Sequence, residues 1–327
     1  MSVPFSIIRK GIFYSDIEIN THKNTSVNVC VYETENNYNR KRGIKMTKPK
    51  PLKEGQPYVI SVVCQKGGVG KSTCSIILAT QLANMGYKVL VADVDQQGNC
   101  TETFTGLAIR QLRLQGYLGV VYAVNPAEDP HEYLWDDADF DMKLPENLDL
   151  LIGDENSGFF SEKLSEYGVI DKNTALANMF KKFDGEYDFI IIDTAPALSP
   201  MLTNALVASD GVVCMYQPEK YCYSAMFSLF ETIENVQTVN PKLKPLGILT
   251  ALMDRRRSDM QEFVDLIFEN EQLGKYCFKT IIKRAAATGR LAYAGVVKAA
   301  NPEADLAMKQ YIPFVKELLK RGQENIR

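Results

Sequence analysis

The stretch VVCQKGGVGKST, residues 62–73, surrounds a glycine cluster with two lysines, Lys66 and Lys71. Glycines let backbone N–H groups converge on phosphate oxygens, and a lysine directly after them reaches the β- and γ-phosphates of a nucleotide. An apolar run precedes the stretch and a helical pattern follows it, as a phosphate-binding P-loop requires. Only the first position departs from the general pattern, because Gln65 stands there in place of glycine. The expected nucleotide-binding residues are Gly67, Gly68, Val69, Gly70, Lys71, Ser72 and Thr73.

A nucleotide of this kind is bound with Mg²⁺, and the Ser72 hydroxyl is the expected first ligand. A second strand must then end in a carboxylate that holds the ion through water. Asp193 supplies it at the end of the apolar run in YDFIIIDTAP, residues 187–196. Asp93 and Asp95 end a third run. Each could simply cap its strand, but ligands in open α/β sheets bind at the carboxyl ends of strands, which favours a functional role.

Apolar, partly β-branched runs provide the elements that would position these side chains. They occupy residues 58–64, 88–94, 148–152, 187–192, 211–216, 246–252 and 276–282. Near-continuous apolar runs are typical of parallel strands that are buried on both faces. Helical patterns lie between most of them, so the sequence predicts a doubly wound α/β fold with a mostly parallel sheet of about seven or more strands.

Two helices are marked clearly. The one after the glycine cluster is expected to end at Gly86. Asn301, Pro302 and Glu303 predict the start of a last helix, because a cap residue is followed by proline and an acid. Its predicted apolar face consists of Leu306, Tyr311, Val315, Leu318 and Leu319, with a kink at Pro313.

The chain is predicted to consist of a basic extension, residues 1–57, and one domain, residues 58–327. The extension holds ten Lys and Arg against five Asp and Glu, although the whole chain has a net charge of −3. Alternating valines predict a short strand in residues 26–33, which would belong to a small hairpin, and residues 39–57 read as a linker. Residues 251–327 are also basic, with fourteen Lys and Arg against ten Asp and Glu, so the middle of the chain is acidic. Basic ends on an acidic body favour an anionic partner.

Composition disfavours several other classes of protein. No apolar run reaches the length of about 20 residues that a membrane-spanning helix needs, and the N-terminus lacks the features of a secretory signal. The seven cysteines include no CxxC pair, so we expect reduced, mostly buried thiols. The two histidines lie far apart in the sequence, which disfavours a zinc site.

Together these motifs resemble a known family. KGGVGKST is similar to the deviant P-loop of the ParA/MinD ATPases, which carry a second lysine before the glycine pair. VADVDQQGN, residues 91–99, resembles the ParA-type DxDPQGN segment, with Gln96 in place of the usual proline. FIIIDTAP resembles the family's Walker B segment, and YQPEKYCYSAM, residues 216–226, resembles the stretch after the next strand. The resemblance covers residues 58–321.

The resemblance implies a role for each charged residue. In this family two subunits sandwich ATP, so Lys71 would bind the nucleotide of its own subunit and Lys66 would cross to that of the partner. Asp95 matches the position that orients or activates the attacking water. Asp93 would belong to the Mg²⁺ network with Ser72 and Asp193. The implied activity is hydrolysis of ATP to ADP and phosphate, with weak intrinsic turnover.

Within the family, the chain looks like a ParA-type partition ATPase. Such proteins bind DNA non-specifically as dimers and are released when a centromere-binding, ParB-type partner stimulates hydrolysis. Arg256, in the segment MDRRRSD, and Arg290, in TGRLAYAG, best match DNA-contacting arginines. The resemblance implies a cytoplasmic, nucleoid-associated protein that does not bind membranes. Two alternatives stay open: a MinD-like ATPase that cycles on a membrane, and a weakly catalytic nucleotide switch that recruits protein partners.

Overall fold

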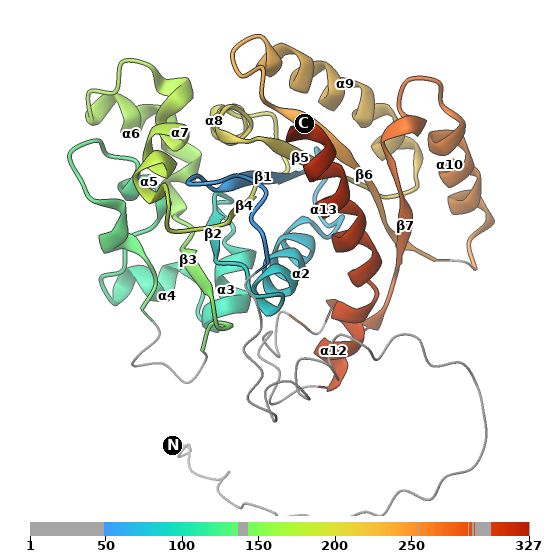
Figure 1. The fold of residues 1–327 in the computed structure, drawn as a ribbon, viewed down its shortest axis with the longest axis horizontal. Coiled ribbons are helices and arrows are strands. Elements are labelled where there is room, and N and C mark those ends of the chain that lie inside the picture. Colours follow the sequence, from blue (N-terminus) through green and yellow to red (C-terminus); the bar gives the residue numbers. More distant parts are fainter. Residues whose placement is uncertain are drawn as a thin grey trace, which may run out of the picture. The chain divides into compact units, whose positions relative to one another are not determined.

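The computed structural model describes residues 49–136, 143–254, 256–286, 288–289, 291 and 302–326. Within them, seven parallel strands form one sheet in the order β3-β2-β4-β1-β5-β6-β7 (Figure 1). The strands are β1 (Tyr58–Val63), β2 (Val89–Asp93), β3 (Leu148–Leu151), β4 (Phe189–Asp193), β5 (Gly211–Tyr216), β6 (Lys244–Met253) and β7 (Cys277–Lys283). Each lies on a predicted apolar run, so the doubly wound α/β fold is confirmed.

The sheet is buried on both faces because its strands are apolar at successive positions. Along β2, Val89 and Val91 belong to one hydrophobic core cluster, whereas Leu90 and Ala92 belong to another. Neighbouring side chains of a strand point to opposite faces, so each face has its own core. Helices must therefore cover both faces.

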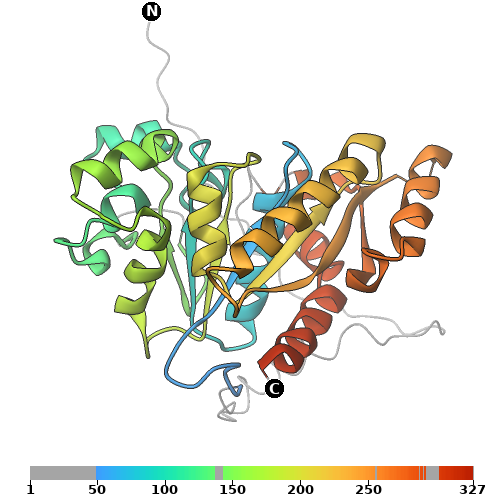
Figure 2. The ribbon, with the colours of Figure 1, turned by 90° about the horizontal axis from the view of Figure 1, so that it is seen from above.

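Helices cover these two faces in layers (Figures 1 and 2). On one face α2 packs against the strands and against α13, and on the other α7, α8 and α9 follow one another. The helices are α2 (Lys71–Asn84), α3 (Asn99–Thr105), α4 (Ile109–Leu114), α5 (Val120–Ala123), α6 (Phe160–Glu166), α7 (Ala175–Phe180), α8 (Pro200–Ala208), α9 (Lys220–Gln237), α10 (Ser258–Glu269), α12 (Pro302–Lys309) and α13 (Ile312–Ile326).

The helix after the glycine cluster ends where the sequence predicts. Its C-cap is Met85, and Gly86 follows with a φ of 93°. Glycine adopts this left-handed conformation without the steric penalty that a Cβ atom brings, which is why it ends helices so often.

The predicted last helix is in fact two helices, and one residue of its expected apolar face was assigned wrongly. The chain turns between α12 and α13, at residues 310 and 311. Tyr311, Val315 and Leu318 are buried, but Leu306 is 64% exposed. Pro313 lies at the second position of α13, where proline is tolerated because its missing N–H has no partner within the helix. The turn breaks the helical period, so Leu306 does not share a face with the residues after it.

The described part of the linker contacts the domain. Lys53 Nζ lies 2.9 Å from both carboxylate oxygens of Asp210, and Leu52 packs against the core. The division of the chain after residue 57 stays a prediction. The strand expected in residues 26–33 lies outside the described residues.

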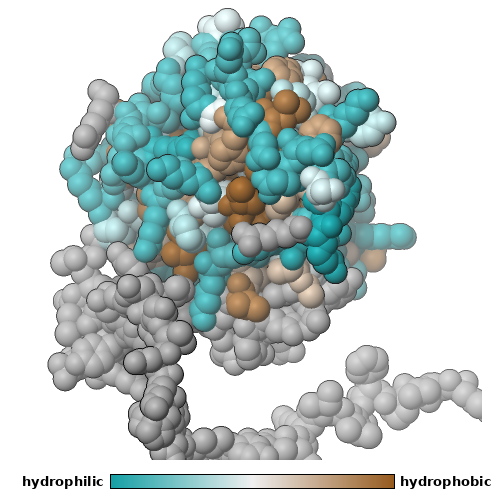
Figure 3. All heavy atoms as spheres, turned by 90° about the vertical axis from the view of Figure 1, so that its right-hand side faces the viewer, coloured by the Kyte–Doolittle hydropathy of each residue, from teal (hydrophilic) through white to brown (hydrophobic). Residues whose placement is uncertain are grey.

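Figure 3 shows the side of the molecule that carries α10 and β7, where hydrophilic side chains predominate and apolar ones show between them. The apolar side chains exposed on α10 include Leu266 and Phe268. Among the described residues, no helix combines the length and the apolar character that crossing a membrane demands.

Candidate functional site

Residues 64–70 connect β1 to α2 and are called the phosphate loop below. Gly68 and Gly70 have φ values of 74° and 90°, a conformation in which a Cβ atom would be strained. A Cβ built on either glycine, or on Gly67, would meet no atom within 4 Å, so the backbone is open to a ligand. Helix α2 begins without a side-chain cap and has no acidic residue in its first turn. Its first N–H groups can therefore bind an anion.

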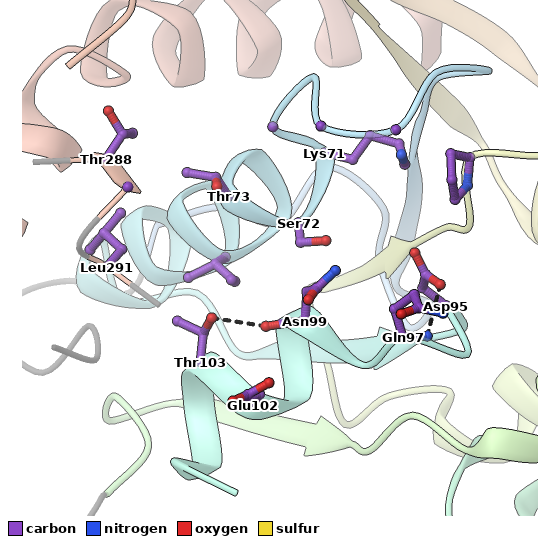
Figure 4. Close-up of a pocket in the computed structure, with 16 residues that line it drawn as sticks. Lys71, Ser72, Thr73, Asp95, Gln97, Asn99, Glu102, Thr103, Thr288 and Leu291 are labelled. Atoms are coloured by element: carbon purple, nitrogen blue, oxygen red, sulfur yellow. Dashed lines mark hydrogen bonds between the residues drawn. The ribbon is translucent and has the colours of Figure 1, made fainter. Parts of the chain in front are cut away.

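A cavity of about 520 Å³ opens beside this loop (Figure 4). That volume falls within the range of about 300–1,000 Å³ that is usual for small-molecule sites. The loop and the start of α2 form one wall with Gly67, Gly68, Gly70, Lys71, Ser72 and Thr73. The opposite wall consists of Asp95 and Gln97, which precede α3, and of Asn99, Glu102 and Thr103 on α3. Of the predicted nucleotide-binding residues, Val69 alone does not line the cavity, because its side chain is buried in the core.

Lys71 is positioned by the first turn of α2. Its side chain is buried, and Nζ donates a hydrogen bond of 3.5 Å to the carbonyl oxygen of Lys66. The ammonium group therefore lies over the backbone of the phosphate loop (Figure 4). A cation at this place can neutralise the charge of terminal phosphates.

Asp193 ends β4 directly beside the phosphate loop. The carboxylate is fully buried and accepts a 2.8 Å hydrogen bond from Ser75 Oγ on α2. Burial raises the pKa of Asp193 to about 6, and hydrogen bonds from Ser72 and Ser75 oppose that rise. Its Oδ2 atom is buried and has no hydrogen-bond partner within the part of the chain that the structure describes. An unpaired buried carboxylate oxygen is costly, and a cation would remove that cost.

Asp93 ends β2 in register with Asp193. Its Oδ2 atom accepts hydrogen bonds from Thr101 N, at 2.8 Å, and Thr101 Oγ1, at 2.7 Å, and its Oδ1 atom accepts one from Asp95 N, at 3.2 Å. Burial and the nearby charge of Asp193 raise the pKa of Asp93 to about 8. Both oxygens thus hold the chain that leads into α3, and a role in the metal network stays a prediction.

Asp95 lies two residues further on and faces the cavity (Figure 4). Its Oδ1 atom accepts a 3.0 Å hydrogen bond from Gln97 N, which fixes the carboxylate in the turn before α3. The structure thus brings Asp95, Lys71 and Ser72 to one cavity, as the sequence predicts, and a carboxylate held in this way can orient a water molecule.

Lys66 occupies a different place. Its Nζ forms an ion pair with Glu219, the residue before α9, and lies 3.5 Å from Gln217 Oε1. Lys66 is not among the residues that line the cavity. Glu219 lies in the segment of residues 216–226, and its role was not predicted from the sequence. An acid three residues after a strand's carboxyl end, where ligands bind in open α/β sheets, was the available signal.

The predicted DNA-binding arginines lie away from the cavity or outside the described residues. Arg256 is exposed at the turn before α10, and its Nε and Nη2 atoms donate to Asp254 at 3.0 and 2.8 Å. These hydrogen bonds lower the pKa of Asp254 to about 2. Arg290 belongs to the residues that the structure does not describe.

The sequence was compared with protein families and with known proteins. A family model described as an AAA domain matches residues 58–245. The chromosome-partitioning ATPase Soj of Thermus thermophilus is 32% identical over 266 residues, which cover 81% of this chain and 96% of that protein. The chromosome partitioning protein ParA of Caulobacter vibrioides is 34% identical over 206 residues, covering 61% and 71%.

A solved structure, cobyrinic acid a,c-diamide synthase from Mycobacterium smegmatis with bound ADP and magnesium, has a TM-score of 0.62. It is 27% identical and covers 73% of this chain and 91% of its own. The fold, the phosphate loop and the near-complete coverage of a partitioning ATPase agree: this chain belongs to the ParA-type family of partition ATPases.

Proposed function

We propose that two copies of this chain dimerise around ATP, bind DNA non-specifically, and separate when a ParB-type centromere-binding partner stimulates hydrolysis. The different placement of the two lysines carries this proposal. Lys71 is buried and turned to the loop backbone, whereas the Lys66 side chain is 40% exposed and lies outside the cavity. Lys71 would bind the nucleotide of its own chain. Lys66 would reach a nucleotide in a second copy, once Glu219 releases it.

Exposed apolar side chains support a partner surface on the same edge of the sheet. Phe159, Leu198 and Tyr221 follow the carboxyl ends of β3, β4 and β5 and are 63%, 56% and 79% exposed. The phosphate loop follows the carboxyl end of β1 on that edge. Large exposed apolar groups are typical of protein–protein interfaces, so a second copy that meets the nucleotide here would also bury them.

The residues beside the loop fit Mg²⁺. The Ser72 hydroxyl lines the cavity, and the buried Oδ2 atom of Asp193 has no partner among the described residues. These two groups would hold the ion, and Asp93 would support them by fixing the adjacent loop through Thr101. When bound, Mg²⁺ neutralises charge on the phosphate oxygens.

Hydrolysis then needs a positioned water and stabilised phosphate charge. Asp95 would hold the water through a carboxylate oxygen and accept its proton. Lys71 would stabilise charge on the phosphates within the chain, and Lys66 would add a second cation from the partner. Because Lys66 is paired with Glu219 in the single chain, intrinsic turnover is expected to be weak.

DNA binding is proposed for Arg256 and Arg290. Arg256 is highly exposed, and phosphate contacts need only cations at suitable spacing. Each arginine would occur twice in a dimer, which would multiply the attraction to DNA. The protein would then act in the cytoplasm, on the nucleoid.

The test measures the oligomeric state of the purified protein and its binding to DNA and to liposomes. Size-exclusion chromatography with light scattering should show a dimer with ATP and Mg²⁺ but not with ADP. Pelleting with plasmid DNA should require ATP, and pelleting with anionic liposomes should fail. Liposome binding without DNA binding would instead support a membrane-cycling ATPase, and a monomer in ATP would contradict the proposal.

A further inference from the structure

A second cavity, of about 450 Å³, lies between α9 and the chain that leads into β7. Phe227, Phe230 and Glu234 line it from the helix, and Glu271 and Tyr276 line it from the other side. Its volume falls within the range of about 300–1,000 Å³ that is usual for sites enclosing a small ligand, so it can hold a long side chain of another protein. The nucleotide site described above contains none of these residues.

Aromatic rings form much of the lining of this cavity. The ring centroids of Phe230 and Tyr276 lie 5.0 Å apart, and Phe227, which is 36% exposed, contacts Tyr223 with ring centroids 5.4 Å apart. The Nζ atom of Lys275 lies 5.0 Å from the centroid of the Tyr276 ring, so a cation of the chain itself already contacts this lining. Aromatic faces attract cations, and arginine most often, because its planar group also stacks on a ring.

Two carboxylates face each other across the aromatic lining. Glu234 on the helix and Glu271 on the opposite side are both exposed. Among the residues that the structure describes, neither forms an ion pair or a hydrogen bond through its side chain. Their charges are therefore available to a ligand, and they favour a cationic one. The phosphates of DNA or of an anionic membrane would be repelled here.

Hydrogen bonds hold the two sides of the cavity together before anything binds. The Asn270 Nδ2 atom donates to the Tyr223 hydroxyl on α9 at 3.1 Å. The Oδ1 atom of the same asparagine accepts hydrogen bonds of 3.0 Å from the backbone N–H groups of Gln272 and Leu273. The chain that carries Glu271 is thereby fixed against the helix. A cavity formed in advance lowers the ordering cost that binding must overcome.

We propose that this cavity is a docking site for a protein partner that inserts an arginine side chain from a basic, exposed segment. The guanidinium group would stack on the rings of Phe227, Phe230 and Tyr276. Its N–H groups would donate charge-assisted hydrogen bonds to Glu234 and Glu271. The apolar stem of the arginine would cover the exposed part of Phe227. Lysine, which has a compact and strongly hydrated charge, fits this arrangement less well.

The position of the cavity separates this proposal from the proposed function. Residues 271–276 precede the amino end of β7, whereas the phosphate loop follows the carboxyl end of β1, and the strands are parallel. Arg256 likewise follows the carboxyl end of its strand, β6. A partner docked in the cavity would therefore leave the phosphate loop and Arg256 free. Docking should need neither ATP nor dimerisation.

Docking is measured on the full chain by fluorescence anisotropy. The probe is a short fluorescein-labelled peptide in which arginine alternates with leucine, and peptides with lysine or glutamate in place of arginine are compared with it. The arginine peptide should bind more tightly than the lysine peptide, and the glutamate peptide should not bind. ADP, or ATP with Mg²⁺, should leave the affinity unchanged. An arginine peptide that does not bind, or binds no better than the lysine peptide, would overturn the proposal.

Variants of exposed side chains locate the site without disturbing the core. Glu234→Gln combined with Glu271→Gln should raise the dissociation constant of the arginine peptide by about tenfold, because two charged acceptors are lost. Glu162→Gln combined with Glu262→Gln removes the same charge from α6 and α10, outside the cavity, and should leave the constant unchanged. Phe227→Ala and Phe227→Leu should each weaken binding by about threefold, since both remove the ring. Equal losses in the two double variants would show unspecific attraction and contradict the proposal.

Cross-linking identifies the residues that the peptide contacts. A benzophenone group on the arginine peptide should label residues 227–234 or 271–276, as mass spectrometry of the digest would reveal, and labelling confined to other segments would rule the site out. A nucleotide-free dimer that Phe227→Ala separates would show that a second copy occupies the cavity, against this proposal. A protein that stays monomeric in ATP but binds the arginine peptide would contradict the proposed function and support the docking site.

Discussion

The ammonium group of Lys66 is paired with the carboxylate of Glu219 within a single chain. Glu219 directly precedes α9, so the ion pair joins the phosphate loop to the start of the helix that follows β5. A lysine held by its own chain must exchange that partner before it can serve a nucleotide in a second copy. In the proposed ATP-bound dimer, the ion pair would therefore oppose dimerisation until the charge of ATP competes for Lys66.

Glu219→Gln should favour the ATP-bound dimer, because it removes this competing carboxylate. The side chains are 40% and 23% exposed, so each pair should contribute no more than about 1 kcal/mol. The two pairs of a dimer would then change its dissociation constant by about 30-fold at most. Analytical ultracentrifugation with ATP and Mg²⁺ measures that constant. The matched control is Glu231→Gln, which changes an exposed glutamate of α9. A weaker dimer in Glu219→Gln would show that the acid supports the interface instead.

Substitution of the two lysines should impair different steps, ATP binding for Lys71 and dimerisation with hydrolysis for Lys66. Lys71→Ala should weaken ATP binding by about 2 kcal/mol or more, at least about 30-fold, because the phosphates lose a charged donor. Lys66→Ala should bind ATP normally yet neither dimerise nor hydrolyse it, since Lys66 does not line the cavity. Calorimetry with a non-hydrolysable ATP analogue separates the two variants. Wild-type turnover by Lys66→Ala would leave this lysine a structural role only.

Asp95→Ala should trap an ATP-bound dimer. The variant removes the carboxylate that is proposed to hold the water, and it leaves Lys71 and Ser72 in place. Loss of a general base typically costs about 10²- to 10⁴-fold in rate. Chromatography with ATP and a phosphate-release assay measure the two effects. A variant that binds ATP but stays monomeric would argue that Asp95 builds the interface.

Arg256→Ala should reduce the salt dependence of DNA binding. Each lost phosphate contact lowers the slope of log affinity against log salt by about 0.9, so a dimer that loses two contacts should change by about 1.8. ATP-dependent dimerisation should be unaffected, because Arg256 is exposed at the turn before α10. Arg290→Ala is predicted to behave alike.

The matched control for this experiment is Arg113→Ala, which removes an exposed arginine of α4. A salt titration on two unrelated duplexes gives the slopes. Unchanged slopes for both Arg256→Ala and Arg290→Ala would place the DNA surface elsewhere, with the basic residues 40–53 as the next candidate.

His131 should make stability depend on pH. Its hydrogen bond with Asp129, at 2.6 Å, and a weaker one with Glu186, at 3.0 Å, raise the pKa of the imidazole. A raised histidine pKa stabilises the fold below the unfolded value of about 6.5, and the gain is lost as the pH rises through the folded pKa. The pair is partly exposed, so the gain should stay below about 1 kcal/mol.

Urea unfolding of wild type and His131→Asn at pH 5.5 and 8.5 measures this contribution. The wild type should be more stable than the variant at the lower pH, and the difference should shrink at the higher one. A difference that is equal at both values would show that packing of the ring on Phe183, not its charge, matters here.

The seven strands and the phosphate loop could be predicted because their signals are local. An apolar run sets a buried strand, and glycines with a following lysine set a phosphate site within a few residues. Other features depend on contacts between distant residues. The partner of Lys66 lies 153 positions away in the sequence. Leu306 was misplaced because helical periodicity cannot reveal a turn that the packing of Tyr311 makes favourable.

Thr101 connects the nucleotide cavity to the edge of the sheet. Its backbone N–H and hydroxyl donate to Asp93, and the hydroxyl accepts a 2.8 Å hydrogen bond from Gly153 N, just after the edge strand β3. Thr101 is therefore bonded both to the end of β2 and to the chain that follows β3. A shift of Asp93 on nucleotide binding would therefore move Thr101 and, through Gly153, the chain that follows the edge strand. A partner that binds at this edge of the sheet would then contact residues whose positions depend on the nucleotide.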